Sequence, residues 1–209
     1  RQPSIAVGPG RVNVIGEHTD YNAGWVLPMA IDRQVGIAFA GRSGRTLRAH
    51  SVAFAETVEI GLDGLDPPGS AEWHSYVAGV AWAMMASGLE VTGADLAIDG
   101  DLPVGSGLSS SSALVMSTAL ALCGASRIPW SPRDMVLVGH RVEREWVGIR
   151  GGVMDQFIAV MGQRGSALLL DCRDLSFEHV PMPKEALVVV MDTGAPRTLA
   201  DSGYNECSA

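Results

Sequence analysis

Basic residues, cysteines and long apolar runs are all scarce in this chain of 209 residues. The 15 Lys and Arg stand against 23 Asp and Glu, which gives a formal net charge of −8. An acidic chain without a basic run is a poor candidate for nonspecific nucleic-acid binding. The charge does not exclude a local anion site, because backbone N–H groups can supply one.

The three cysteines, Cys123, Cys172 and Cys207, are scattered and show no CxxC spacing. They indicate neither a disulfide framework nor a zinc site, and they fit a reducing cytoplasm best. No apolar run approaches the roughly 18 residues of a membrane span, and no secretory signal opens the chain. Because Arg1 stands where a methionine is usual, we expect further residues to precede it.

Apolar residues are abundant enough for a sizeable core, at 47% hydrophobic against 18% charged, so the chain is not disordered. Strands are predicted at residues 4–7, 12–15, 35–40, 57–60, 95–99, 167–171 and 186–191. Helices are predicted at 72–87, from the serine run to about 123, from Ser131-Pro132 onward, and at 154–161. This mixture favours the α+β class without fixing the topology.

The run "GSGLSSSSAL" at residues 105–114 follows a predicted strand and leads into a predicted helix. Such an arrangement presents several free N–H groups to an anion. Gly105 and Gly107 can adopt positive φ and let a phosphate approach the backbone. The loop has no lysine, which excludes a Walker A motif and leaves a metal ion as the simplest source of cation. An ordinary serine-capped helix start is the alternative.

A polar cluster lies between two apolar stretches in residues 8–32. Its side chains are Arg11, Asn13, Glu17, His18, Asp20 and Asn22. Charged and amide groups are what a sugar site requires, because each sugar hydroxyl both donates and accepts. A solvated hairpin turn explains the composition about equally well. Zinc is a weaker option, since His18 has no second His or Cys at ligand spacing.

Two acidic residues are further candidates. Asp155 falls in the first turn of a predicted helix, where most acids only complement the helix dipole. Here Gly151 and Gly152 precede it, so a substrate can approach closely. Glu143 is either a solvated flank or a Mg²⁺ ligand. It lies beside a predicted buried stripe of Met135, Val138, Val142 and Trp146.

Three motifs together resemble a known family. "GRVNVIGEHTDYNAGWVLPMAID" is similar to the galactokinase signature, and "GGVMDQF" also matches galactokinases. "LPVGSGLSSSSAL" resembles the phosphate-binding motif of the wider galacto-, homoserine, mevalonate and phosphomevalonate kinase (GHMP) superfamily. The resemblance runs from about Gly8 to Tyr204. Departures are Ser106 and Ser112, where relatives often have glycine and alanine, and the stretch from Met191 onward.

The resemblance implies roles for individual residues. Asp155 corresponds to the catalytic aspartate and Arg11 to the arginine beside it. The implied galactose contacts are Glu17, His18, Asp20, the Gly152 backbone and Tyr204. The implied phosphate loop is Gly105, Ser106, Gly107, Leu108, Ser109, Ser110, Ser111 and Ser112, with Ser111 and Glu143 as Mg²⁺ ligands. Trp73 and Tyr76 match the nucleotide-base side, although core packing also explains them.

The fold that the resemblance implies is the two-domain GHMP kinase fold with a ribosomal-protein-S5-like N-terminal domain. Residues 1–165 would form that domain, and residues 166–209 would begin a truncated C-terminal domain. The implied activity is ATP-dependent phosphorylation of D-galactose at its C1 hydroxyl, with Mg²⁺, by a cytoplasmic monomer that binds neither nucleic acid nor membrane. The alternatives are a kinase for N-acetylgalactosamine or arabinose, and a sensor of galactose and ATP that does not catalyse.

Overall fold

The computed structural model describes residues 2–67 and 72–191, and its largest element is a five-stranded sheet. The strands, in spatial order, are β1 (Ser4–Asn13), β3 (Pro28–Gly41), β6 (Ala94–Gly100), β4 (Thr46–Ser51) and β5 (Glu56–Gly61). β4 runs parallel to β6, and the other neighbours are antiparallel. The parallel pair requires a crossover connection, and α1 lies within it.

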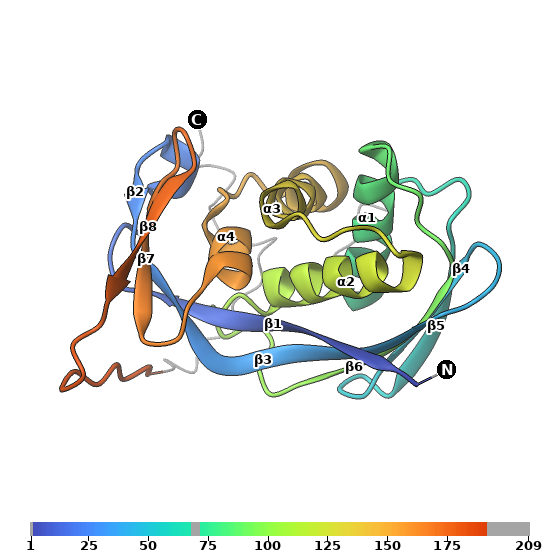
Figure 1. Cartoon of the computed structure of the whole chain (residues 1–209), viewed down its shortest axis with the longest axis horizontal. Helices are drawn as coiled ribbons and strands as arrows, with labels where there is room; N and C mark the ends of the chain where they lie inside the picture. Colours follow the sequence, from blue (N-terminus) through green and yellow to red (C-terminus); the bar gives the residue numbers. More distant parts are fainter. Residues whose placement is uncertain (1, 68–71, 192–209) are drawn as a thin grey trace.

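A smaller three-stranded sheet consists of β2 (Trp25–Val26), β7 (Ser166–Asp171) and β8 (Ser176–Pro181). Figure 1 shows it standing at one end of the five-stranded sheet. The domain boundary predicted after residue 165 falls directly before β7. Because β7 pairs with β2 from the beginning of the chain, this strand is joined to the N-terminal part by backbone hydrogen bonds. The boundary itself stays a prediction.

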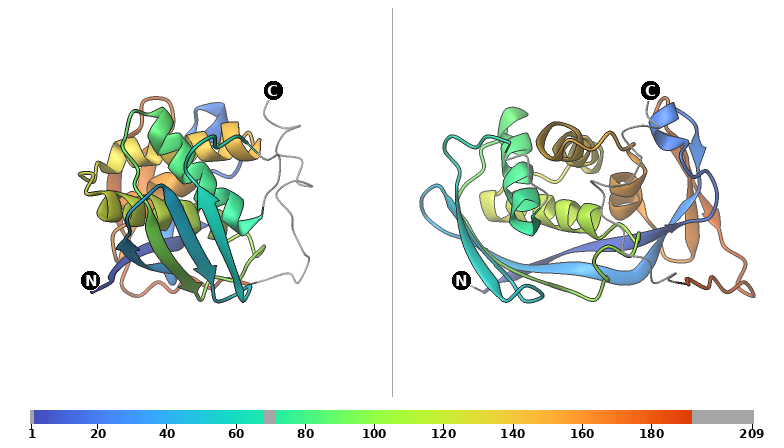
Figure 2. Two further views of the ribbon diagram at one scale, coloured as in Figure 1. Left: turned by 90° about the vertical axis from the view of Figure 1, so that its right-hand side faces the viewer. Right: turned by 180° about the vertical axis from the view of Figure 1, so that it is seen from behind.

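The helices cover one face of the five-stranded sheet, as Figures 1 and 2 show. They are α1 (Trp73–Ala86), α2 (Ser110–Ser126), α3 (Pro132–Arg141), a π-helical turn η2 (Val142–Val147) and α4 (Met154–Met161), with a short 3₁₀ turn η1 (Asp20–Asn22) near the smaller sheet. α2 is central, because it contacts β1, β3, α1, α3 and α4. No helix in the described part of the chain is long and apolar enough to cross a membrane.

Apolar side chains of the helices form much of the main core. Val77, Val80 and Met84 of α1 are fully buried, and so is most of the Met135–Trp146 stripe on α3 and η2. Full burial of each such side chain contributes roughly 1.5–3 kcal/mol. A second cluster joins Phe157 and Ile158 of α4 to Leu168 and Leu170 of β7. The main core and this second cluster therefore hold the helices next to the polar loops in place.

Two glycines in β1 let this strand approach the start of α2. A Cβ at Gly8 would lie 2.2 Å from the Ala113 carbonyl oxygen, and one at Gly10 would lie 2.9 Å from that of Leu108. Real Cβ atoms do not come so close to backbone, so only glycine fits at these positions. The next residue, Arg11, bonds from its backbone N–H to the Leu108 carbonyl at 3.1 Å. The close approach therefore brings Arg11 to the serine loop.

Most predicted elements are confirmed, and the α+β mixture with them, but two predictions are wrong. Residues 186–191 form no strand, and Leu187 is 86% exposed. A strand needs a partner, and none of the strands in the described ranges pairs with this segment. The strand predicted at 12–15 ends at Asn13 as part of β1. Sequence reasoning also missed β2, β4 and β8.

Candidate active site

One cleft of about 460 Å³ gathers most of the candidate residues. It lies at the N-terminal end of α2, and β1, α1, η2 and the start of α4 contribute to its lining. The candidates that line it are Arg11, Asp20, Trp73, Tyr76, Gly105, Gly107, Ser109, Ser110, Ser111, Glu143, Gly152 and Asp155. Glu17, His18, Ser106, Leu108 and Ser112 do not line it. Tyr204 lies outside the described residues.

The loop between β6 and α2 has the backbone that its glycines predict. Gly105 and Gly107 have φ of 75° and 76°. A helix start leaves its first N–H groups without intrahelical partners, and the N-cap residue Ser109 makes no side-chain capping bond to them. The start of α2 therefore presents backbone donors and the partial positive charge of the helix dipole toward the cleft. An anion such as phosphate fits this position.

The four serines of the loop have different surroundings. Ser110 and Ser111 line the cleft, whereas Ser112 is 1% exposed and donates to Oε1 of Glu143 at 2.8 Å. Ser106 donates instead to the Pro103 carbonyl at 2.9 Å. Ser109 donates to Oδ2 of Asp155. Of these serines, only Ser110 and Ser111 both line the cleft and have a hydroxyl that makes no described hydrogen bond.

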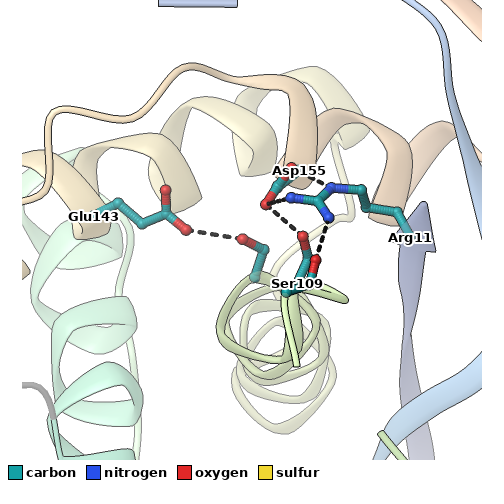
Figure 3. Close-up of polar contacts among 6 residues, drawn as sticks. Arg11, Ser109, Glu143 and Asp155 are labelled. Carbon is teal, nitrogen blue, oxygen red and sulfur yellow. Dashed lines mark hydrogen bonds and ion pairs between the residues drawn. The ribbon is translucent and has the colours of Figure 1, made fainter. Parts of the chain in front are cut away.

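Asp155, Arg11 and the serine loop form one connected group (Figure 3). Arg11 donates from Nε to Oδ1 of Asp155 at 2.6 Å and from Nη2 to Oδ2 at 2.7 Å. Its Nη1 donates to the Gly107 carbonyl at 2.7 Å. The two side chains are 14% and 23% exposed, so the pair is largely removed from water. A bidentate pair of this kind fixes both orientation and charge.

Glu143 has a different environment on the other side of the loop. It is 9% exposed, and none of the salt bridges among the described residues involves it. Burial, together with the charge of Asp155, raises the pKa of Glu143 to about 7, while the Ser112 hydroxyl acts in the opposite direction. Burial and the charge of Glu143 also raise the pKa of Tyr76 to about 12.

A Mg²⁺ ion fits the residues present at this point. A buried carboxylate without a cationic partner gains from a cation nearby, and the Ser111 hydroxyl is in the same cleft. In the described ranges no group of three or more His, Cys, Asp or Glu could hold a metal ion. Mg²⁺ typically needs only one or two protein oxygens when phosphates and water complete its shell.

The predicted sugar contacts are only partly brought together. Asp20 of η1 lines the cleft against Gly152, where an added Cβ would lie 2.3 Å from Asp20 Oδ2. Burial, then the charge of Asp155, raises the pKa of Asp20. Glu17 is exposed, and His18 is exposed with its Nδ1 2.6 Å from the Tyr21 hydroxyl.

The aromatic pair predicted for the nucleotide base lies at the α1 side of the cleft. Trp73 donates from Nε1 to Glu56 at 2.7 Å and stacks on Phe54, with ring centroids 6.3 Å apart. Tyr76 is 6% exposed and belongs to the main core as well. Sequence reasoning missed Phe54, which also lines the cleft. The sequence offered little signal for it, because Phe54 lies between β5 and the missed strand β4.

Comparison with known proteins finds relatives of this chain. The family model for the GHMP kinase N-terminal domain matches residues 75–163, and the galactokinase galactose-binding signature matches residues 1–41. The chain is 31% identical to galactokinase from Lactococcus lactis, solved with galactose, at a TM-score of 0.87 over 99% of this chain and 54% of that one. The chain also matches mevalonate kinase from Methanococcus jannaschii with a TM-score of 0.71, over 85% of this chain and 56% of that one. At 19% identity, this match shows the fold alone.

These matches and the architecture define the GHMP kinase fold. Among curated proteins, the galactokinase of Chloroflexus aurantiacus is 45% identical over 97% of this chain and 52% of its own length. That of Thermococcus kodakarensis is 41% identical over 95% of this chain and 55% of its own. Within that fold class, the chain matches the galactokinase galactose-binding signature and is similar to galactokinases along nearly its whole length. It spans about half the length of the curated relatives it matches.

Proposed function

We propose that the protein transfers the γ-phosphoryl group of ATP to the C1 hydroxyl of D-galactose, giving galactose 1-phosphate and ADP. The observation that carries this proposal is the bidentate Arg11–Asp155 pair directly beside the start of α2. It combines an anion-binding helix start with a carboxylate that can face a sugar hydroxyl. The likeness to a galactokinase solved with galactose supports the choice of sugar.

Phosphoryl transfer depends mainly on positioning and on stabilising charge. The backbone donors of the loop at 105–109 and the hydroxyls of Ser110 and Ser111 would bind the β- and γ-phosphates. Ser111 and Glu143 would hold Mg²⁺, which neutralises charge on the phosphate oxygens when bound. Phe54, Trp73 and the buried Tyr76 would contact the base at the α1 side.

On the sugar side, Asp155 would accept the hydrogen bond of the C1 hydroxyl and aim its oxygen at the γ-phosphorus. The proton would then transfer to Asp155 once the new P–O bond has begun to form. Arg11 holds the carboxylate through two bonds and so fixes its orientation. Asp20 and the Gly152 backbone would contact other hydroxyls, and we propose the same for Glu17, His18 and Tyr204.

A coupled ADP-release assay across sugars tests the proposal on the natural protein that contains this chain. Galactose should support turnover at a kcat/KM well above that of N-acetylgalactosamine and arabinose. A higher value with either of those sugars would identify a related sugar kinase. Tight binding of galactose and ATP without ADP release would identify a sensor. We also propose a monomer in the cytoplasm, and the free thiols of Cys123 and Cys172 among the described residues fit the reducing conditions of that compartment.

A further inference from the structure

Ser109 occupies an unusual position at the start of α2. It is the N-cap residue, yet its side chain makes no capping hydrogen bond. Its backbone is left-handed, with φ of 61° and ψ of 41°, a conformation that few residues other than glycine adopt. The hydroxyl is directed toward α4, where it donates to Oδ2 of Asp155 (Figure 3). Serine is common at helix N-caps, but the side chain of Ser109 contacts Asp155 instead of capping the helix.

The number of protons on Ser109 decides what else it can bind. A serine hydroxyl has one proton to donate, and an ionised carboxylate accepts only. While Ser109 donates to Asp155, it has no proton left for a phosphate oxygen. Its remaining lone pairs would face the phosphate oxygens unfavourably, since both carry negative charge density. Ser110 has no such contact with Asp155 among the described hydrogen bonds and keeps its proton available.

Ser109 also completes the set of donors around Asp155. Arg11 supplies one bond to each carboxylate oxygen, and Ser109 adds another to Oδ2. Arg11 in turn bonds to the carbonyl of Gly107, two residues before Ser109. Asp155 is thus connected to the serine loop through two separate side chains. Loss of the Ser109 bond would leave Oδ2 held from the Arg11 side alone.

We infer that Ser109 is a positioning residue for Asp155 and that its hydroxyl, unlike those of Ser110 and Ser111, does not bind phosphate. This inference rests on the proposed function, in which Asp155 must face the C1 hydroxyl. The left-handed backbone at Ser109 directs the hydroxyl to the carboxylate of Asp155. Their hydrogen bond holds this carboxylate in the orientation that receives the sugar. A misplacement of about 1 Å in such a group lowers the rate of the chemical step by up to about 10²-fold without weakening substrate binding.

Two variants of the natural protein that contains this chain test the inference, Ser109→Ala and Ser109→Gly. Both remove the hydroxyl, and the glycine variant also accepts the positive φ without strain, so it keeps the fold. We expect kcat to fall about 10–100-fold in both. The KM for galactose, and the Kd of Mg²⁺·ADP by calorimetry, should change less than about twofold. Ser110→Ala is the contrast, and it should raise the Kd of Mg²⁺·ADP several-fold.

The outcomes separate the inference from the function on which it rests. A lower kcat with unchanged Kd in Ser109→Gly supports the positioning role. If Ser109→Gly raises the Kd of Mg²⁺·ADP as Ser110→Ala does, Ser109 is a phosphate ligand and the inference is overturned. Unchanged kcat in Ser109→Gly overturns it as well. Absence of galactose-dependent ADP release by the unmodified protein would instead overturn the proposed function together with the inference.

Discussion

The two carboxylates on either side of the serine loop, Asp155 and Glu143, are held in opposite ways. Asp155 is partly open to the cleft and is paired with a guanidinium through two bonds. Glu143 is buried, and the side chains that donate to its carboxylate are neutral, chiefly the hydroxyl of Ser112. The first carboxylate is thus paired with a cation, whereas burial disfavours the negative charge of the second.

This difference suggests that the two carboxylates have separate roles within one cleft. A carboxylate that already has its cation can orient a neutral hydroxyl without attracting a metal ion strongly. A buried carboxylate without a cation gains most when a divalent ion arrives, because the ion offsets the cost of its charge. We therefore propose that Asp155 faces the sugar and that Glu143 faces Mg²⁺.

The largest effect is expected for Asp155→Asn. The amide can still contact a hydroxyl, but it cannot take its proton or pair with Arg11 as an ion. Turnover should fall by roughly 10²–10⁴-fold, while calorimetry should show galactose still binding. If turnover and galactose binding disappear together, Asp155 supports the fold of the site and the proposed contrast does not hold.

Glu143→Gln should change the pH dependence of stability. In the folded protein the pKa of Glu143 is raised from 4.5 to about 7, so the fold favours the protonated form. Its destabilising contribution is absent below about pH 4.5 and grows as pH rises toward about 7. Without divalent cations, the unfolding free energy of the unmodified protein should fall by up to about 3 kcal/mol more than that of the variant over this range. Parallel urea-unfolding profiles of the two proteins would show that Glu143 is not disfavoured as an anion.

Arg11→Lys should lower kcat about tenfold or somewhat more. The ammonium group of lysine cannot reproduce two parallel bonds to Asp155 together with the bond to the Gly107 carbonyl. Steady-state kinetics of Arg33→Lys provide the control, because the Arg33–Asp101 pair is exposed, with side chains 58% and 48% accessible. That variant should keep its kcat, and equal losses in both would argue against a special role for the Arg11 pair.

The smallest effect is expected for Gly152→Ala. The new Cβ would lie 2.3 Å from Asp20 Oδ2, so Asp20 must move away from the cleft. We expect galactose binding, measured by calorimetry, to weaken about fivefold to tenfold. Gly151→Ala is the matched control, because its Cβ would come only within 3.4 Å of Glu143 Oε2, an ordinary contact. Equal affinity of the two variants would place Asp20 outside the sugar site.

Local features of the site could be predicted from the sequence. The positive φ of Gly105 and Gly107 and the helix that follows them depend on neighbouring residues only. The contacts that distinguish the serines could not be predicted, because they join distant residues. Ser109 bonds to a residue 46 positions away, and Ser112 bonds to one 31 positions away. Nothing in "SSSS" says which hydroxyl turns toward which carboxylate.

The same difference between local features and long-range contacts applies to the fold. The helices were predictable because each has apolar residues at helical spacing within its own segment, as Val77, Val80 and Met84 show for α1. The two-residue strand β2 exists only because β7 pairs with it. The apolar segment 186–191 was predicted as a strand from its composition, yet no described strand pairs with it. Pairing, and not composition, decides such segments.

The most direct test is a crystal structure of the natural protein that contains this chain, bound to galactose, Mg²⁺ and a non-hydrolysable ATP analogue. We expect the β- and γ-phosphates to lie against the backbone of residues 105–111 and the C1 oxygen of galactose to lie within hydrogen-bond distance of Asp155. The metal ion should lie on the Glu143 side of the loop. Phosphates bound elsewhere, or a sugar remote from Asp155, would contradict this expectation.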